Sequence, residues 1–349
     1  MTTHPRGGKV TIGTIAAEAG VSTATVSKVL NGRSDVSPAT RERIQQIVAR
    51  RHYHRRGGRR RGGIVDLVLN ELDSLWSIEI IRGAEEALRA EGVSMVLSAV
   101  HGSTAGTGAW LEQLTARRSD GAILVVSDLT LHQRTKLKAL DIPFVLVDPV
   151  GAVETGVPTI GATNWAGAIA ATEHLIGLGH RRIAHLAGPR HLLCSRARAD
   201  GFRAAMEQAG LDIPQWAVRH GEFTDPSGHA EMTALLDEAE RAGHAPPTAV
   251  FAASDLQAFG AYAALRQRGL RVPHDMSVVG FDDVPVARWS DPTLTTVHQP
   301  LQDMAAMAAR TLLRLIDGEH VDLPRVELAT RLVVRDSTAP PVQGAEAPS

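Results

Sequence analysis

Two hydrophobic patterns divide the chain into a short N-terminal part and a long remainder. In the first part, apolar residues recur three and four positions apart, as in Ile12, Ile15 and Ala19, which predicts short amphipathic helices. From Ile64 onward, short apolar runs alternate with amphipathic stretches. This alternation predicts parallel sheets whose strands are joined by right-handed helical crossovers.

The N-terminal part carries cap and turn residues that divide it into three helices. Thr11 is placed to cap the first helix and Gly20 to end it, because glycine adopts the left-handed conformation at little cost. Ser22 is placed to cap the second helix, and Ser37-Pro38 begins a third. Two short helices across the turn Ala19-Gly20-Val21 predict a helix-turn-helix, whose second helix enters the major groove of DNA.

Charge is distributed unevenly along the chain. Residues 1–63 hold 13 Lys and Arg against three carboxylates, a net charge of +10, whereas the rest holds 24 against 35, a net charge of −11. A basic head on an acidic body is typical of a nucleic-acid-binding module fused to another domain. The alternatives are a solvated basic tail, or a small helical domain without a role on DNA.

The second helix of the head supplies the candidate DNA contacts. Thr23 and Ala24 lie at its start, where a recognition helix meets base edges, and Lys28 is suited to a phosphate. The full set of DNA-contacting candidates is Thr11, Ser22, Thr23, Ala24, Thr25, Ser27, Lys28, Asn31, Arg55, Arg56 and Arg59.

The remainder of the chain reads as two similar α/β halves. The predicted strands are residues 64–69, 94–100, 121–126 and 142–148, and then 181–188, 216–221, 248–254 and 276–283. Two such halves predict two lobes with a cleft between them. Ligands of open α/β sheets bind at the carboxyl ends of the strands, so residues that follow the strands are the candidates for a ligand site.

Composition excludes several classes of protein. The single Cys194 permits no internal disulfide, and the start MTTHPRGGKV lacks the apolar run of a secretory signal, so we expect a cytoplasmic protein. The motifs G-x-S-x-G and Walker A are absent, as is G-x-G-x-x-G after a strand, so we expect no enzyme and no cofactor. His180, His185 and His191 do not have the spacing of metal ligands.

The stretch VTIGTIAAEAGVSTATVSKVLNGRSDVSPATRERIQQIV resembles the DNA-binding head of the LacI/GalR family of transcriptional regulators. The segments HLIGLGHRRIA, TAVFAASD and SVVGFDDVPVA resemble the ligand-binding core of that family. GATNWAG and LCSRARADGF are similar to actinobacterial regulators of xylan and xylo-oligosaccharide use. The resemblance implies a small all-α helix-turn-helix head plus a periplasmic-binding-protein-like α/β core of two doubly wound parallel-sheet subdomains. It also implies a homodimer that reads a near-palindromic operator in double-stranded DNA.

The linker departs from the family, in which a hinge helix places leucines in the minor groove. Here residues 54–63 read HRRGGRRRGG, in which two Gly-Gly pairs oppose a helix and no leucine is present. Its arginines enter a narrow minor groove or contact phosphates, or else the segment is a flexible tether without sequence preference. We therefore expect a DNA-binding domain at 1–53, an Arg/Gly-rich linker at 54–63, an effector-binding and dimerisation domain at 64–336, and a disordered tail at 337–349. The tail carries no leucine heptads, so it predicts dimers and not tetramers.

Sugar recognition needs forked donors, carboxylate acceptors and an aromatic face. Arg198 and Asp282 offer the donor and acceptor after two strands, and Asp148 and Ser254-Asp255 end two others. The resemblance adds Trp76, placed in the loop after the first strand, together with Phe223 and Gln299. The effector-site candidates are therefore Trp76, Asp148, Arg198, Phe223, Ser254, Asp255, Asp282, Gln299 and Trp165.

Structural roles remain open for several of these residues. Arg198 and Asp282 could form an inter-lobe salt bridge, and Trp76 or Trp165 could serve in packing. Cys194 is expected to be a small packing residue near the cleft, and Asp283 to cap or bond locally.

The sequence thus predicts a repressor whose operator binding is controlled by a small sugar, xylose or a xylo-oligosaccharide, bound between two lobes. The alternatives are a cytoplasmic sugar-binding protein of the same fold without regulatory DNA binding, and a carbohydrate-active enzyme.

Overall fold

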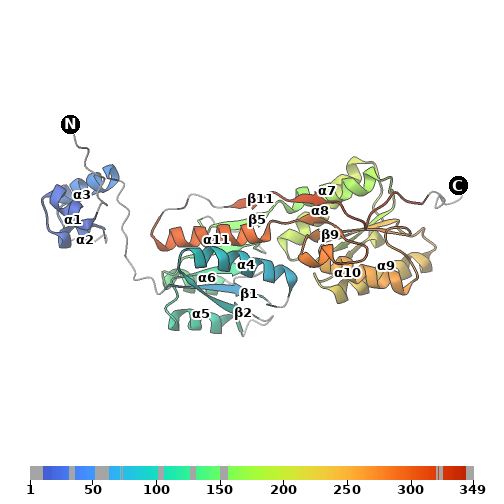
Figure 1. The fold of residues 1–349 in the computed structure, drawn as a ribbon, viewed down its shortest axis with the longest axis horizontal. Helices are drawn as coiled ribbons and strands as arrows, with labels where there is room; N and C mark the ends of the chain where they lie inside the picture. The colour runs from blue at the N-terminus through green and yellow to red at the C-terminus, as the bar shows by residue number, and fades with distance from the viewer. Residues whose placement is uncertain are drawn as a thin grey trace. The chain divides into compact units, whose positions relative to one another are not determined.

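The computed structural model divides the chain into two separate units (Figure 1). The described residues are 11–30, 36–51, 63–70, 72, 74–100, 106–125, 131–149, 156–319, 321 and 325–342. The first unit runs from Met1 to Arg61 and the second from Gly62 to Ser349, so the division falls within the predicted linker. In this described part of the chain, no helix has both the length and the apolar character needed to cross a membrane.

The first unit contains three helices: α1 (Ile12–Ala19), α2 (Thr23–Leu30) and α3 (Pro38–Arg50). Thr11 caps α1 through a reciprocal pair of hydrogen bonds with Thr14, and Gly20 ends the helix with φ of 64°. The Ser22 hydroxyl accepts a hydrogen bond from the backbone N–H of Thr25, which is the N-cap contact of α2. The predicted helix-turn-helix and its caps are confirmed.

A small apolar core joins the three helices, and its buried members are Ile15, Ala16, Ala19, Val26, Val29, Ile44 and Ile47. At the edge of this core, Glu18 of α1 is ion-paired with Arg50 and Arg51 at the end of α3. The hydrogen bond from Arg51 lowers the pKa of Glu18, so the carboxylate is ionised near neutral pH. These contacts fix α1 against α3 and leave the outer side of α2 in solvent.

The first lobe of the second unit is a parallel six-stranded sheet in the order β11-β5-β4-β3-β1-β2. Its strands are β1 (Ile64–Leu69), β2 (Ser94–Ala99), β3 (Gly121–Val125), β4 (Phe144–Val147), β5 (Thr159–Ala162) and β11 (Val326–Leu328). The helices α4 (Leu75–Ala90) and α11 (Leu301–Ile316) pack on one face, and α5 (Gly106–Ala116) and α6 (Leu131–Ala139) on the other. In β1, Leu67 contacts one apolar cluster and Val68 the other, as in strands buried on both faces.

The second lobe is a six-stranded sheet in the order β12-β10-β9-β8-β6-β7, in which only β12 runs antiparallel to its neighbour. Its strands are β6 (Ile183–Ala187), β7 (Val218–His220), β8 (Ala249–Ala252), β9 (Ser277–Asp282), β10 (Thr295–His298) and β12 (Arg331–Val333). The helices α7 (Asn164–Gly177) and α8 (Leu193–Gln208) pack on one face, and α9 (Asp225–Ala242) and α10 (Asp255–Gln267) on the other. The short 3-10 turns η1 (Gln215–Ala217) and η2 (Pro285–Arg288) precede β7 and follow β9.

Three segments connect the lobes: β5 to α7, β10 to α11, and β11 to β12. The first and third lie side by side, because the N–H of Thr330 donates to the Thr163 hydroxyl at 2.9 Å and the N–H of Thr163 donates to the carbonyl of Leu328 at 2.9 Å. Figure 1 shows β5 and β11 running together toward the second lobe. The two-lobed α/β core is confirmed, although β5, β10, β11 and β12 were not among the predicted strands, and the antiparallel β12 departs from a purely parallel sheet.

The folded part of the second unit extends beyond residue 336, so the predicted start of a disordered tail at 337 is wrong. Ser337 is fully buried, and its hydroxyl donates to the carbonyl of Val278 at 2.6 Å and accepts from the N–H of Thr295 at 2.8 Å. The ring Nε2 of His180 lies 2.9 Å from the carbonyl oxygen of Ala339. Composition predicted disorder, but these residues satisfy backbone groups of β9 and β10. Residues 343–349 of the predicted tail lie outside the described residues.

Candidate functional site

Asp148 in the first lobe and Asp282 in the second have unusual backbone angles, and both lie at the carboxyl end of a strand. Asp148 follows β4 with φ of 48°, and Asp282 ends β9 with φ of 122°. Both angles are positive, and such conformations cost a residue with a side chain roughly 1–3 kcal/mol. Strain of this kind concentrates at ligand sites, so both residues remain candidates.

Arg198 on α8 is 3% exposed and is held by groups of the second lobe. Its Nε donates to Asn164 Oδ1 at 2.9 Å, and its Nη1 donates to the carbonyl of Ala253 at 2.5 Å. Nη1 also lies 3.6 Å from Asp282 Oδ1, and the guanidinium carbon lies 3.8 Å from the centre of the Phe281 ring. The Arg198–Asp282 pair is therefore confined to one lobe, and the alternative of an inter-lobe salt bridge is wrong.

Asp282 and Gln299 form the acceptor side of this arrangement. Asp282 is 7% exposed and accepts a hydrogen bond from Gln299 Nε2 at 2.6 Å. Burial raises the pKa of Asp282 to about 6, although the charge on Arg198 acts in the opposite direction. The Gln299 Oε1 atom is buried and has no donor among the described residues. A buried carbonyl oxygen without a donor is costly, so it marks a place suited to a ligand hydroxyl.

Asp283, next in the chain, is tied to a different network and its side chain is 1% exposed. Its carboxylate accepts from His298 Nδ1 at 3.0 Å and from Arg335 Nη2 at 2.5 Å. Burial raises the pKa of Asp283, but hydrogen bonds from His298 and Arg335 outweigh burial, and the net shift is downward. Asp283 thus joins β10 to the segment after β12, and its predicted local bonding is corrected to a long-range one.

Ser254 and Asp255 follow β8 as predicted, but their side chains are engaged within the second lobe. The Ser254 hydroxyl caps α10 by accepting from the N–H of Gln257 at 3.2 Å. Asp255 is fully buried and accepts from Thr296 Oγ1 at 2.5 Å and from the N–H of Val284 at 2.9 Å. Burial raises the pKa of Asp255, and the nearby charge of Asp282 raises it further. Both residues hold the ends of β8, β9 and β10 in place around Asp282.

The two aromatic residues carried over from the resemblance have different surroundings. Trp76 lies in the first turn of α4, and not in the preceding loop, because Ser74 caps that helix. Its half-buried side chain packs against the core of the first lobe, as in the packing alternative. The Phe223 ring packs directly over Gly188, where a Cβ atom would lie 2.2 Å from the ring. The Arg198 guanidinium lies 5.4 Å from the centre of the same ring, so Phe223 and Arg198 face a common region.

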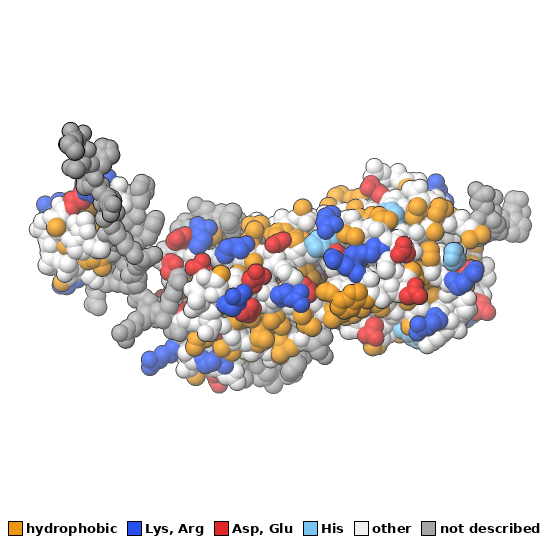
Figure 2. Space-filling model, in the orientation of Figure 1, with side chains coloured by type: hydrophobic (Ala, Val, Ile, Leu, Met, Phe, Trp, Pro, Cys, Tyr) orange, Lys and Arg blue, Asp and Glu red, His pale blue; other side chains and the backbone are white. Residues whose placement is uncertain are grey.

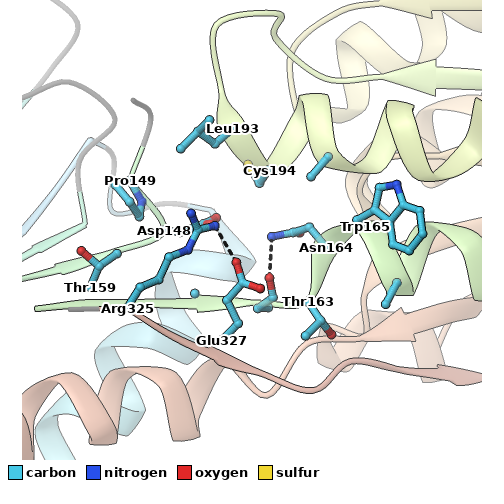
Figure 3. A pocket seen from close by; sticks show the side chains of 14 residues that line it. Asp148, Pro149, Thr159, Thr163, Asn164, Trp165, Leu193, Cys194, Arg325 and Glu327 are labelled. Atoms are coloured by element: carbon cyan, nitrogen blue, oxygen red, sulfur yellow. Dashed lines mark hydrogen bonds and ion pairs between the residues drawn. The ribbon is translucent and has the colours of Figure 1, made fainter. Parts of the chain in front are cut away.

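A pocket of about 340 Å³ lies between the lobes, beside this cluster (Figure 3). Its first-lobe wall comes from β4, β5 and β11 and includes Asp148, Arg325 and Glu327. Its second-lobe wall comes from the starts of α7 and α8 and includes Asn164, Trp165, Leu193 and Cys194. Of the predicted effector residues, only Asp148 and Trp165 line this pocket. Arg325 and Glu327 were missed because β11 is too short for a periodic pattern.

Asp148 and Cys194 meet across the pocket from opposite lobes. Burial raises the pKa of Asp148, while the charge on Arg198 and a hydrogen bond from the Cys194 thiol lower it. Burial raises the pKa of the Cys194 thiol as well, so the thiol is neutral and unreactive near neutral pH. This fits the packing role expected for Cys194.

The DNA-contacting candidates of the first unit lie on the outer side of α2 and at helix caps. Ser22, Thr23, Ala24 and Lys28 are exposed, whereas Thr25 and Ser27 are half-buried. Thr11 is an exposed cap of α1. The remaining candidates, Asn31, Arg55, Arg56 and Arg59, lie outside the described residues.

A metal site has no support in the described part of the chain, where no group of three or more His, Cys, Asp or Glu side chains could hold an ion. His185 illustrates the alternative role of a buried histidine. It stacks between Phe202 and Phe251, and burial lowers its pKa to about 3, so the ring is neutral.

A helix-turn-helix with an exposed second helix, joined to a two-lobed α/β unit with a pocket between its lobes, defines the class of ligand-responsive transcription regulators. Residues 11–56 match the family model of bacterial regulatory proteins of the lacI family, and residues 172–338 match that of periplasmic binding protein-like domains. The chain is similar to the HTH-type transcriptional regulator CelR of Thermobifida fusca, with 38% identity over 346 residues that cover 94% of this chain and 98% of the relative. The chain therefore belongs to the lacI family of DNA-binding transcription regulators and is not an enzyme.

Solved structures agree with this assignment. A transcriptional regulator CelR–cellobiose complex is similar at a TM-score of 0.73 and 36% identity, with 94% of this chain and all of that chain covered. The lac repressor dimer bound to operator and the anti-inducer ONPF is similar at a TM-score of 0.70 and 29% identity, with 95% and 99% covered. The predicted family and fold are confirmed.

Proposed function

We propose that this protein is a sequence-specific repressor whose operator binding is controlled by a sugar held between the two lobes of its core. The observation that carries the sugar half is the cluster of Arg198, Asp282 and Gln299, which combines a forked donor, a carboxylate and an amide oxygen without a donor. Vicinal hydroxyls need donors and acceptors in this combination.

The DNA half of the proposal rests on α2. Thr23 and Ala24 lie exposed at its N-terminal end, which in a helix-turn-helix meets base edges, and the exposed Lys28 one turn later is suited to a phosphate. The face of the second unit shown in Figure 2 carries acidic and basic side chains interspersed. We therefore assign DNA binding to the basic head and its Arg-rich linker.

Control by the effector follows from contacts in both lobes. A ligand held by Asp148 of the first lobe and Arg198 of the second favours one arrangement of the lobes, and its differential affinity for the two arrangements sets the shift in operator binding. The cellobiose in the relative's complex supports a sugar effector. The resemblance of the GATNWAG and LCSRARADGF segments favours xylose or a xylo-oligosaccharide as the particular sugar.

A homodimer on a near-palindromic site completes the proposal, and the lac repressor dimer on its operator supports it. We expect light scattering at low micromolar concentration to give a dimer, because a two-fold-symmetric operator site matches a two-fold-symmetric protein. A stable tetramer at that concentration would contradict this expectation.

The experiment that tests the proposal is a gel-shift with fragments of the source genome, followed by footprinting of the bound fragments, with and without xylose, xylobiose and cellobiose. We expect protection of a two-fold-symmetric site that one of these sugars changes. Calorimetric binding of a sugar without retention of any fragment would support the alternative of a sugar-binding protein without regulatory DNA binding.

A further inference from the structure

The pocket beside the Arg198 cluster carries a second set of groups suited to sugar hydroxyls. Glu327 of β11 and Arg325, just before that strand, form an ion pair on its wall, with side chains that are 39% and 58% exposed. In Figure 3, Asp148, Arg325 and Glu327 lie toward one end of the pocket and Trp165 toward the other. An exposed ion pair contributes little to stability, so these two side chains can turn to a ligand at little cost.

Trp165 presents a large aromatic side chain at this pocket. Its side chain is 50% exposed, which is unusual for a large apolar residue, although it lies in the first turn of a well-packed helix. Its backbone is held by Gly201 of α8, where a Cβ atom would lie 2.4 Å from the Trp165 carbonyl oxygen. An indole that lines a pocket and is half exposed to solvent is suited to the apolar face of a sugar ring.

Asn164 joins the pocket to the Arg198 cluster. Its side chain lines the pocket, accepts from Arg198 Nε through Oδ1, and donates to the carbonyl of Ala162 through Nδ2 at 3.1 Å. The charges on Arg198 and Arg325 both act to lower the pKa of Asp148, which lies near both guanidinium groups. The two sets of polar groups are therefore adjacent, with Asp148 and Asn164 shared between them.

The charges of the pocket favour a neutral ligand. Among the described residues that line it, Asp148 and Glu327 contribute two carboxylates and Arg325 contributes one guanidinium, so acidic groups outnumber basic ones. A phosphorylated or acidic ligand would meet this excess of carboxylates, and the repulsion would oppose its binding.

We infer that the effector is a neutral oligosaccharide, with one ring at Arg198 and Asp282 and the chain continuing past Asp148 over Arg325 and Glu327 to the indole of Trp165. This inference rests on the proposed function and extends its site. Because Asp148, Arg325 and Glu327 belong to the first lobe and Asn164 and Trp165 to the second, each added ring bridges the lobes. A longer sugar therefore binds more tightly and shifts operator binding more strongly than the monosaccharide.

The test is calorimetry on the full-length protein with two series of probes: xylose, xylobiose and xylotriose, and glucose, cellobiose and cellotriose. The measured quantity is the ratio of trisaccharide affinity to monosaccharide affinity. We expect Trp165→Ala to lower this ratio about tenfold, since one stacked ring is lost. Trp165→Phe keeps an aromatic face and should lower it less than about threefold. Arg325→Ala should lower it about fivefold through lost hydrogen bonds.

The matched control is Arg314→Ala. Arg314 of α11 forms an exposed ion pair with Glu319, and neither residue lines the pocket. This variant should leave the ratio of affinities unchanged. Equal affinities of the wild type for one, two and three rings, or a ratio unchanged by both Trp165→Ala and Arg325→Ala, would overturn the extended site alone. Binding of none of these sugars to the wild type would overturn the proposed sugar control as well.

Discussion

Removal of the Arg198 side chain should both destabilise the second lobe and abolish sugar binding. Arg198 is 3% exposed, donates hydrogen bonds to Asn164 and to the carbonyl of Ala253, and forms an ion pair with Asp282. In Arg198→Ala the Asp282 carboxylate stays buried and keeps the hydrogen bond from Gln299 Nε2. Breaking a buried ion pair by removing one partner costs about 3–5 kcal/mol, so we expect a loss in unfolding free energy of that order at pH 8.

The loss in unfolding free energy of Arg198→Ala should depend on pH, and the direction of this dependence follows from the ionisation of Asp282. Burial raises the folded-state pKa of this carboxyl to about 6, above the ordinary value for aspartate. Its protonated form therefore stabilises the fold at low pH, and that contribution is lost as pH rises through 6. Without the charge on Arg198, the pKa of Asp282 rises further. At pH 5 the carboxyl of the variant is then neutral and needs no cation, so the difference from wild type is smaller than at pH 8.

The assay is urea unfolding followed by far-UV circular dichroism at pH 5 and pH 8, for wild type, Arg198→Ala and Arg198→Lys. The lysine variant keeps the charge without the fork, so it should recover part of the stability and little of the sugar affinity. An Arg198→Ala variant with wild-type stability at pH 8 would refute the electrostatic account of the lobe. Unchanged sugar affinity in both variants would refute the site.

Three further predictions follow from other parts of the molecule. Lys28→Ala should weaken DNA binding across all sequences and reduce its salt dependence, whereas substitution of Ala24 should change base preference. The reverse pattern in a binding-site selection would show that the roles of Lys28 and Ala24 are misassigned. Sugar affinity should fall about tenfold between pH 7 and pH 5 as Asp282 takes up its proton, and in Asp282→Asn calorimetry should show a weaker affinity with a smaller pH dependence. Ser337→Ala removes a buried hydroxyl that makes two hydrogen bonds and should lower the unfolding free energy by about 1–3 kcal/mol. A loss too small to resolve by urea titration would show that the segment after β12 is not part of the cooperative fold.

The elements with strong local signals were predictable from the sequence. The caps Thr11 and Ser22 and the turn at Gly20 define the head by residue type alone, since hydroxyl caps and a left-handed glycine have few other roles in that spacing. The long buried strands β1 and β9 likewise appear as continuous apolar runs.

The parts that depend on tertiary contacts were not predictable in the same way. Strand β11 has three residues and pairs with β5, which lies far from it in sequence, so no local pattern marks it and the pocket residues Arg325 and Glu327 were missed with it. The confinement of Arg198 and Asp282 to one lobe depends on α8 packing beside β9. The burial of Ser337 likewise depends on groups of β9 and β10 that a Pro/Ala-rich composition cannot reveal.

Control of DNA binding in the head by a sugar bound in the core can be measured by fluorescence anisotropy. A labelled duplex of the footprinted site is titrated with the full-length protein, without sugar and with each sugar of the two series, at several salt concentrations. We expect salt-sensitive binding to the duplex, an affinity that at least one neutral sugar changes, and loss of that sugar response in Arg198→Lys. Identical binding curves for the wild type with and without every sugar, at concentrations that saturate the core by calorimetry, would contradict this expectation.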